Sequence, residues 1–218
     1  MGLVCDPKGK GGNEMIRKVM LAIMLCIVSA LFMSGCGRDY GKVDQGRVIE
    51  FDRDRGTVTM IRDVKTDPGN PEYTYLPPLT YSLPKNVSDI GAEPKTGYRM
   101  KLDAANARII IFDPVTKNFR TIEYKPVKQT ENVEKNDPLV FDKSIGREKD
   151  FPVIDKISKT ITVYSRRQKI VTTFSVQEEF LSMPPKTWEA GDDIRVNYRE
   201  DGKALKMTNL SRTESYKK

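Results

Sequence analysis

The sequence predicts an all-β protein built as two tandem, small, antiparallel five-stranded barrels behind an N-terminal signal helix. Three observations lead to this fold class. From residue 46 onward, apolar and polar residues alternate with the period of two that half-buried strands show. Gly, Pro and Asp residues interrupt these runs at short intervals, as turns between antiparallel strands do. The order of strand and turn patterns in the first half also returns in the second half, which indicates two similar units.

Residues 15–36 predict a secretory signal rather than part of the fold. Met15 precedes two basic residues, an uncharged apolar run over 19–33, and the small residues that lead to Cys36. A basic start, a short apolar core and small residues before a cut describe a signal peptide. The run is shorter than the ~20 apolar residues that a transmembrane helix needs. We expect Met15 to be the true start, and residues 1–35 to comprise an N-terminal extension and the signal.

The position of Cys36, directly after Ser-Gly, resembles the bacterial lipobox, although Met33 replaces the usual leucine. The resemblance implies that Cys36 is linked to diacylglycerol, becomes the first mature residue and anchors the protein through acyl chains such as palmitate. A simple cleaved signal or a membrane anchor is the alternative. The expected location is the cell envelope, facing the periplasm. Gly37 stands where Asp would retain a lipoprotein at an enterobacterial-type inner membrane, which favours the outer membrane.

Composition excludes several classes of function. The chain has 37 basic and 30 acidic side chains, of which residues 1–35 hold four and two, leaving a net charge of +5 in the mature part. This mild excess does not indicate nucleic acid binding, and favours an envelope protein or an anionic polymer as the partner. The chain has no histidine, the commonest general base and metal ligand. Cys5 and Cys26 precede the cut, so no disulfide is expected. We expect no cofactor and no metal.

The first unit follows a short tether. Residues 36–45 are polar, and 46–125 form the first predicted barrel. Its strands are expected as a hairpin around Gly56 (48–52 and 57–61), a short strand (79–83) and a three-stranded meander (98–102, 107–113 and 118–124). The Pro-rich segment 63–78 is expected to be a long loop, because proline cannot donate to a strand ladder.

The second unit follows a charged stretch, 126–149, that is predicted to be a linker. The second predicted barrel spans 150–218 and repeats the order of strand and turn patterns of the first. It begins with a hairpin (151–155 and 160–164), continues with a strand (170–176) and one or two helical turns (177–182), and ends with a hairpin that turns at Asp201-Gly202.

The two halves align in order. Residues 57–59 match 160–162, residues 80–83 match 173–176, and Gly97 with its following strand matches Gly191. If the halves are a duplication, each unit buries its apolar face by curling into an OB-like or SH3-like barrel, because closure removes exposed edges. The alternative is a single larger β-sandwich or barrel.

The signal, the hairpin at Phe51 and the Pro-rich loop from Tyr73 to Pro84 resemble a family of lipoproteins from sulfate-reducing bacteria that carries no assigned activity. This resemblance covers the mature chain and implies a function for Cys36 alone. The second half, with its Thr-Phe-Ser-Val strand, is also similar to periplasmic OB-like metal-carrier domains. Those domains bind copper through His, Met and Trp, and this chain has no His.

Two groups of residues are candidates for a binding surface. Tyr73, Tyr75 and Tyr81 could form an aromatic platform for a sugar or peptide, or could simply pack the loop onto the fold. The basic turn formed by Arg166, Arg167 and Lys169 could grip an anionic group, or could be a solvated hairpin tip.

Other candidates have weaker support. Met183, Trp188 and Met207 could hold a soft metal, although methionine more often fills a core. Acidic neighbours such as Asp192 and Asp193 point to opposite faces of a strand, which does not suit a carboxylate pair across a cleft.

We therefore expect a lipid-anchored, non-enzymatic binding or assembly module. A periplasmic metal-carrier or redox-partner accessory is second, and an enzyme acting on envelope polysaccharide is third. Binding predicts an open groove lined by tyrosines or basic residues. A metal carrier predicts that the methionine sulfurs converge on Trp188, and an enzyme predicts a pocket with convergent carboxylates.

Overall fold

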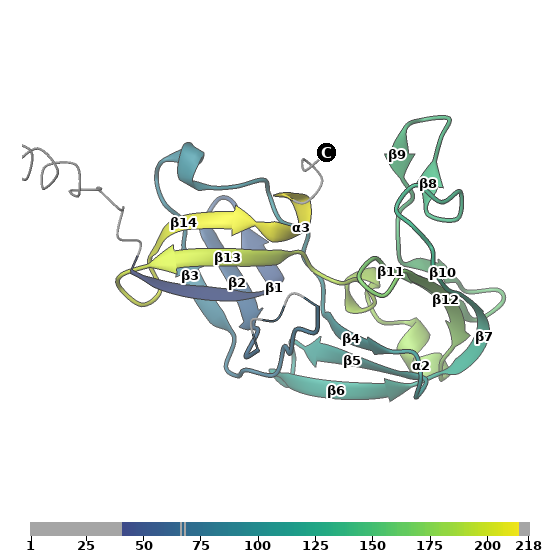
Figure 1. Ribbon diagram of the computed structural model, residues 1–218. Coiled ribbons are helices and arrows are strands. Elements are labelled where there is room, and N and C mark those ends of the chain that lie inside the picture. Colours follow the sequence, from purple (N-terminus) through teal and green to yellow (C-terminus); the bar gives the residue numbers. More distant parts are fainter. Residues whose placement is uncertain (1–40, 66, 68, 214–218) are drawn as a thin grey trace, which may run out of the picture. The chain divides into compact units, whose positions relative to one another are not determined.

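Antiparallel β-sheets dominate the computed structural model, which describes residues 41–65, 67 and 69–213 (Figure 1). The prediction of a predominantly β, antiparallel fold is confirmed. The predicted signal helix and Cys36 lie outside the described residues.

The largest sheet has five strands in the order β14-β13-β1-β2-β3. Gly56, with φ of 62°, turns the β1–β2 hairpin, and Asp52 accepts a hydrogen bond from the Arg55 N–H within that turn. The strand bounds are β1 Lys42–Asp52, β2 Thr57–Arg62, β3 Leu79–Ser82, β13 Asp193–Tyr198 and β14 Ala204–Asn209.

Two smaller sheets and a separate hairpin contain the remaining strands. The three-stranded sheet is a meander of β4 (Arg99–Asp103), β5 (Arg108–Asp113) and β6 (Asn118–Glu123). The four-stranded sheet has the order β10-β11-β12-β7, with β7 Lys125–Thr130, β10 Val153–Asp155, β11 Thr160–Ser165 and β12 Ile170–Ser175. The hairpin of β8 (Phe141–Asp142) and β9 (Arg147–Glu148) projects beyond the four-stranded sheet (Figure 1).

Helical segments are short. They are η1 Val87–Asp89, α2 Glu178–Leu181, η2 Pro185–Thr187 and α3 Leu210–Thr213, and α2 falls where one or two helical turns were expected. Within the described ranges, none of the helices has the length and apolar character to cross a bilayer.

Three apolar clusters hold these sheets together. The first joins the three- and four-stranded sheets and centres on Trp188 and Phe174. The second lies on one face of the five-stranded sheet and includes Val48, Ile194 and Met207. The third lies between the five-stranded and three-stranded sheets, where Ile61 meets Phe112 and its neighbours. The three-stranded sheet therefore contributes apolar side chains to clusters on both of its faces, as alternation along a strand allows.

The sheets differ from the predicted division into two tandem barrels. No sheet in the described ranges is closed into a barrel, although an isolated parallel bridge of Ser82 with Lys203 links the β3 edge of the five-stranded sheet to the start of β14. The last hairpin, assigned to the 150–218 unit, pairs with β1 from the 46–125 unit, in a register that aligns Gly46 with Ile194. This pairing buries Val48 beside Ile194 and Val196, so the apolar face of β1 is covered by the other half.

Two of the connecting segments also differ from expectation. The predicted tether, 36–45, contributes residues 42–45 to β1, because they pair with β13. The predicted linker, 126–149, contains nearly all of β7, an edge strand, and the β8–β9 hairpin.

The internal repeat has a structural counterpart. In the first half, β2 pairs with β3 so that Thr59 lies opposite Thr80, and in the second half β11 pairs with β12 so that Thr162 lies opposite Thr173. Each threonine pair shares a hydroxyl hydrogen bond, of 3.0 and 2.8 Å. Identical register in the aligned positions supports a duplication. The β1–β2–β3 stretch is extended by the β13–β14 hairpin of the second half, whereas the β10–β11–β12 stretch is extended by the single strand β7.

Gly97 and Gly191 pass each other beside β1, just before the β13–β14 hairpin begins. The Gly97 N–H donates to the Val48 carbonyl at 3.1 Å, and the Val48 N–H donates to the Asp192 carbonyl at 3.0 Å. A Cβ on Gly191 would overlap the Val48 carbonyl oxygen. The close approach of three backbone segments therefore requires glycine here.

We predict that Gly191→Ala lowers the free energy of unfolding by about 1–3 kcal/mol, as overpacking in a tight site does. Denaturant unfolding followed by circular dichroism measures this. Gly69→Ala is the matched control, because a Cβ there meets only the Asp67 carboxylate, at an ordinary 3.4 Å. Equal stability of the two variants would contradict the close approach.

Candidate functional site

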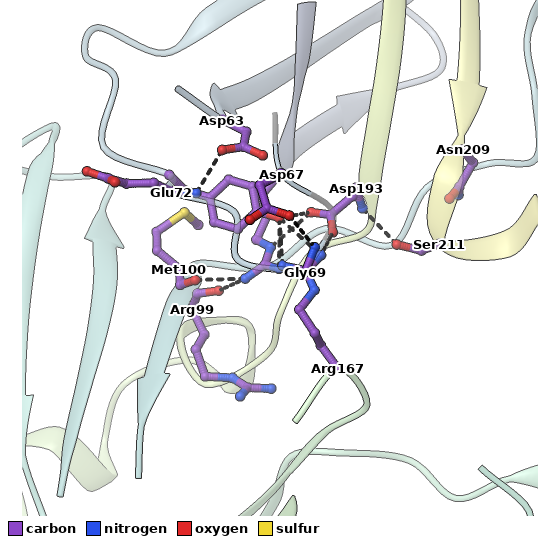
Figure 2. Close-up of polar contacts among 12 residues, drawn as sticks. Asp63, Asp67, Gly69, Glu72, Arg99, Met100, Arg167, Asp193, Asn209 and Ser211 are labelled. Carbon is purple, nitrogen blue, oxygen red and sulfur yellow. Dashed lines mark hydrogen bonds and ion pairs between the residues drawn. The ribbon is translucent and has the colours of Figure 1, made fainter. Parts of the chain in front are cut away.

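A buried polar cluster around Asp193 joins segments that are distant in the sequence (Figure 2). The Tyr73 hydroxyl donates to Asp193 Oδ1 at 2.6 Å, and Arg167 Nη2 donates to Oδ2, also at 2.6 Å. Arg47 Nε lies 3.4 Å from Oδ1. The Asp193 N–H donates to the Ser211 hydroxyl at 2.8 Å. One carboxylate on β13 thus connects β1, the Pro-rich loop and the β11–β12 turn.

Arg47 extends this cluster to the three-stranded sheet. Its Nη1 donates to the carbonyls of Arg99 and Met100 at 3.1 and 2.8 Å, and its guanidinium lies 4.1 Å from the centre of the Tyr73 ring. A planar guanidinium suits this combination of forked hydrogen bonds and stacking. The Arg47 side chain therefore connects β1 to β4 through two backbone carbonyls.

Arg99 makes a second connection from β4. It is buried, and it donates to the carbonyls of Trp188 and Tyr164, each at 2.9 Å. Burial, followed by repulsion from the Arg47 charge, lowers the pKa of Arg99 to about 9. Its cationic form depends on the carbonyl dipoles of η2 and β11, and its hydrogen bonds join β4 to both.

The cluster of Asp193, Tyr73, Arg47 and Arg167 is here called the junction, because its side chains connect these segments. Burial is the main cause that raises the pKa of Tyr73 well above its ordinary value, so its hydroxyl remains a donor at neutral pH. The Asp193 carboxylate already accepts from a phenol and two guanidinium groups. A carboxylate that already accepts from three donors has little capacity to accept a substrate proton. Removing one of its partners would leave a buried charge unpaired.

The predicted aromatic platform is dispersed. Tyr73 is buried in the cluster, and Tyr75 lies under the Arg62 guanidinium, at 4.9 Å from its ring centre. Tyr81 is buried in the five-stranded sheet and donates to Asp44 Oδ2 at 2.5 Å. The three tyrosines thus occupy different surroundings.

The predicted basic turn is a hub for ion pairs. Arg166 binds Glu148 at 2.5 Å and Lys169 binds Glu134 at 2.7 Å, while Arg167 reaches Asp193. Of the six predicted surface residues, the structure brings Tyr73 and Arg167 into contact, with Arg167 Nη1 at 3.4 Å from the Tyr73 hydroxyl. The turn's cations therefore serve internal contacts.

The side chains considered for metal binding do not meet. Trp188 and Met183 belong to the first apolar cluster, whereas Met207 belongs to the second. Among the residues that the structure describes, no group of three acidic or cysteine side chains is placed to hold a metal ion. Asp192, next to Asp193, instead accepts from Lys95 N–H and Asn209 Nδ2, at 2.9 and 2.8 Å.

A shallow hollow of about 330 Å³ lies between the end of β4 and the β7–β12 pair. The Gln168 amide bridges it by donating to the Leu102 carbonyl at 2.9 Å. Its lining mixes isolated charges with apolar side chains: Lys101, Leu102, Asp103, Ala104, Ala105, Gln129, Glu131, Gln168 and Ile170. No set of like charges converges there.

The sequence interpretation missed the segment 131–150, here called the arm, which includes the β8–β9 hairpin and projects from the four-stranded sheet (Figure 1). Its base is anchored by the buried side chains of Val133 and Val140. The Tyr164 hydroxyl donates to the Val133 carbonyl at 3.1 Å, and the ion pairs of Arg166 and Lys169 hold both sides of the base. The sequence signal was the short apolar run before an Asp-to-Gly turn, at 139–146.

The arm ends in a tightly hydrogen-bonded turn. Asp142 Oδ1 accepts from the hydroxyl and the N–H of Ser144, at 2.5 and 2.9 Å, and Gly146 has φ of 66°. Between them the Ile145 side chain is exposed. Lys143 and Arg147 flank it and are also exposed.

We predict that Asp193→Asn destabilises the protein by about 3 kcal/mol, the lower end of the range for breaking a buried ion pair, because Arg167 is partly exposed. Thermal unfolding measures the change. Asp201→Asn, which removes an exposed pair with Lys42, is the control and should leave the unfolding midpoint unchanged. Equal midpoints for the two variants would refute the cluster's structural role.

Tyr73→Phe tests the same cluster through its hydroxyl. It should cost about 1–3 kcal/mol, because the buried carboxylate loses a donor. In the Asp193→Asn background, the additional cost of Tyr73→Phe should become much smaller. Strict additivity in this double-mutant cycle would show that the two groups act independently.

The arm turn predicts a pH effect. The Ser144 hydroxyl, followed by its N–H, holds the pKa of Asp142 below the usual value. The ionised form is therefore favoured by folding, and its contribution to the turn is lost as the pH falls through the folded-state pKa. Carboxyl ¹³C NMR titration should show Ser144→Ala raising the pKa of Asp142. Asp155, whose pKa is lowered by Ser158, should be unaffected and serves as the control.

Comparisons with known proteins add a family. A search of curated proteins found no match, and neither did a search of solved structures. The sequence model of one family, described as Domain of unknown function (DUF4881), matches residues 39–218, which contain every residue of the junction and the arm. The chain therefore belongs to the DUF4881 family.

Proposed function

We propose that the protein is a lipid-anchored cell-envelope protein that acts as a non-enzymatic binding or assembly module. The observation that carries the proposal is the arm. A projecting segment whose base is fixed by buried valines and two ion pairs, and whose tip exposes apolar and cationic side chains, suits contact with a partner.

The polar groups of the fold support binding over catalysis. Asp193, Arg47 and Arg167 are engaged with one another, and the acidic neighbour Asp192 is engaged with Lys95 and Asn209. A catalytic carboxylate must instead be positioned toward a substrate. The dispersion of Met183 and Met207 over two cores likewise argues against the metal-carrier alternative.

Lipidation of Cys36, after removal of residues 1–35, would place the fold close to a membrane. β1 begins at Lys42, and six extended residues span at most about 20 Å. Several acyl chains give stable anchoring, whereas one chain alone is marginal. We place the protein on the periplasmic side of the envelope, with the outer membrane favoured.

Intact-mass analysis of protein purified from its native host tests this proposal. We expect a product that begins at Cys36 and carries diacylglycerol and acyl groups, and that fractionates with membranes. Cys36→Ser should lose the lipid mass and leave the membrane fraction. Cys26→Ser is the matched control and should change neither, because Cys26 lies in the discarded segment. A native product with a bare Cys36 thiol would overturn the anchoring proposal.

A further inference from the structure

Two acidic residues of the arm attach it to the fold. Glu134 and Glu148 pair with Lys169 and Arg166 of the β11–β12 turn, and Glu148 directly follows Arg147 in β9. At the tip, Asp142 is bound to Ser144 within the turn. Lys143 and Arg147 have no ion-pair partner among the described residues. The tip thus presents Lys143 and Arg147 to solvent, whereas Glu134 and Glu148 serve the attachment of the arm.

The same tip exposes apolar surface. The Ile145 side chain is 59% exposed and lies between the two cations in the sequence, and Leu139 on the approach to β8 is 42% exposed. The Asp142 turn and Gly146 fix the backbone that holds Ile145 outward. This is an amphipathic point of a few residues on a rigid support.

The size of the tip favours a lipid surface over a protein partner. A stable protein interface buries about 800 Å² on each side, more than a single hairpin turn provides. Membrane contact requires less, because an apolar side chain enters the interface while neighbouring cations meet anionic head groups. A contact that is weak by itself becomes effective when a tether already holds the protein at the membrane.

We propose that the arm tip, Lys143 to Arg147, docks into the anionic lipid surface as a second membrane contact and so fixes the orientation of the fold. This inference rests on the proposed lipid anchor. The anchor alone holds the protein to the membrane at one point, and a second contact fixes the orientation of the fold.

The test uses the full chain, processed in its host and reconstituted in protein-free vesicles. Since Cys36 is the only cysteine of the mature chain and is capped by lipid, Ile145→Cys introduces a single thiol for an environment-sensitive fluorophore. In vesicles containing phosphatidylglycerol, the probe should shift to shorter wavelength and be quenched by nitroxide-labelled lipid. Both effects should weaken in pure phosphatidylcholine and at high salt.

Ile157→Cys provides the matched control. Ile157 is 97% exposed at the β10–β11 turn and also lies among lysines, but its turn is a plain connection within the four-stranded sheet. A fluorophore at position 157 should remain in water, with no shift to shorter wavelength and no quenching by nitroxide-labelled lipid. Lys143→Gln with Arg147→Gln should shift the docked–free equilibrium of the arm about 25-fold toward the free state, from about five-fold for each of the two cations. Lys156→Gln should not shift it.

The outcomes separate the two proposals. Missing acyl mass on Cys36 would remove the anchor and be seen before any probe is attached. If the protein is acylated, equal signals from positions 145 and 157 would overturn the docking proposal. A response at position 145 that needs native envelope vesicles, and is absent in protein-free lipid, would assign the tip to a protein and overturn it as well.

Discussion

The arrangement of the sheets depends on the hydrogen bonds and ion pairs of the Asp193 carboxylate. It accepts from Tyr73 of the Pro-rich loop and Arg167 of the β11–β12 turn, and Arg47 of β1 lies beside it. A carboxylate buried at such a depth is stable only when hydrogen-bonded and paired, so each partner segment must be in place together. This requirement fixes the loop and the turn against β13, and through Arg47 it also fixes β4.

The pairing of β13 with β1 brings both halves of the chain to the Asp193 cluster. The four-stranded sheet is extended by β7 and shares an apolar cluster with the three-stranded sheet. The two crossing segments meet at Gly97 and Gly191, and two residues beyond each glycine stand Arg99 and Asp193. Equivalent positions of the repeat thus carry opposite charges, and each connects its strand to segments of the neighbouring sheets.

Local structure followed from the sequence, whereas long-range pairing did not. Alternation and turn residues predicted the β1–β2, β11–β12 and β13–β14 strands, because those signals act over a few residues. The same alternation on every strand cannot say that β1 pairs with β13, about 150 residues away. Tyr73 and Arg167 were predicted as surface contacts because a buried partner such as Asp193 is visible only once the fold brings it near. The arm was predicted as a linker, because its charged composition hides two buried valines.

The junction and the proposed role of the arm are linked. A contact at the arm tip can orient the fold only if the junction holds the sheets together as one body. Hydrogen exchange measured by mass spectrometry on Asp193→Asn tests this most directly. We expect faster exchange at the same time in β13, the loop around Tyr73, the β11–β12 turn and the base of the arm. A change confined to β13, with the loop, turn and arm protected as before, would contradict it.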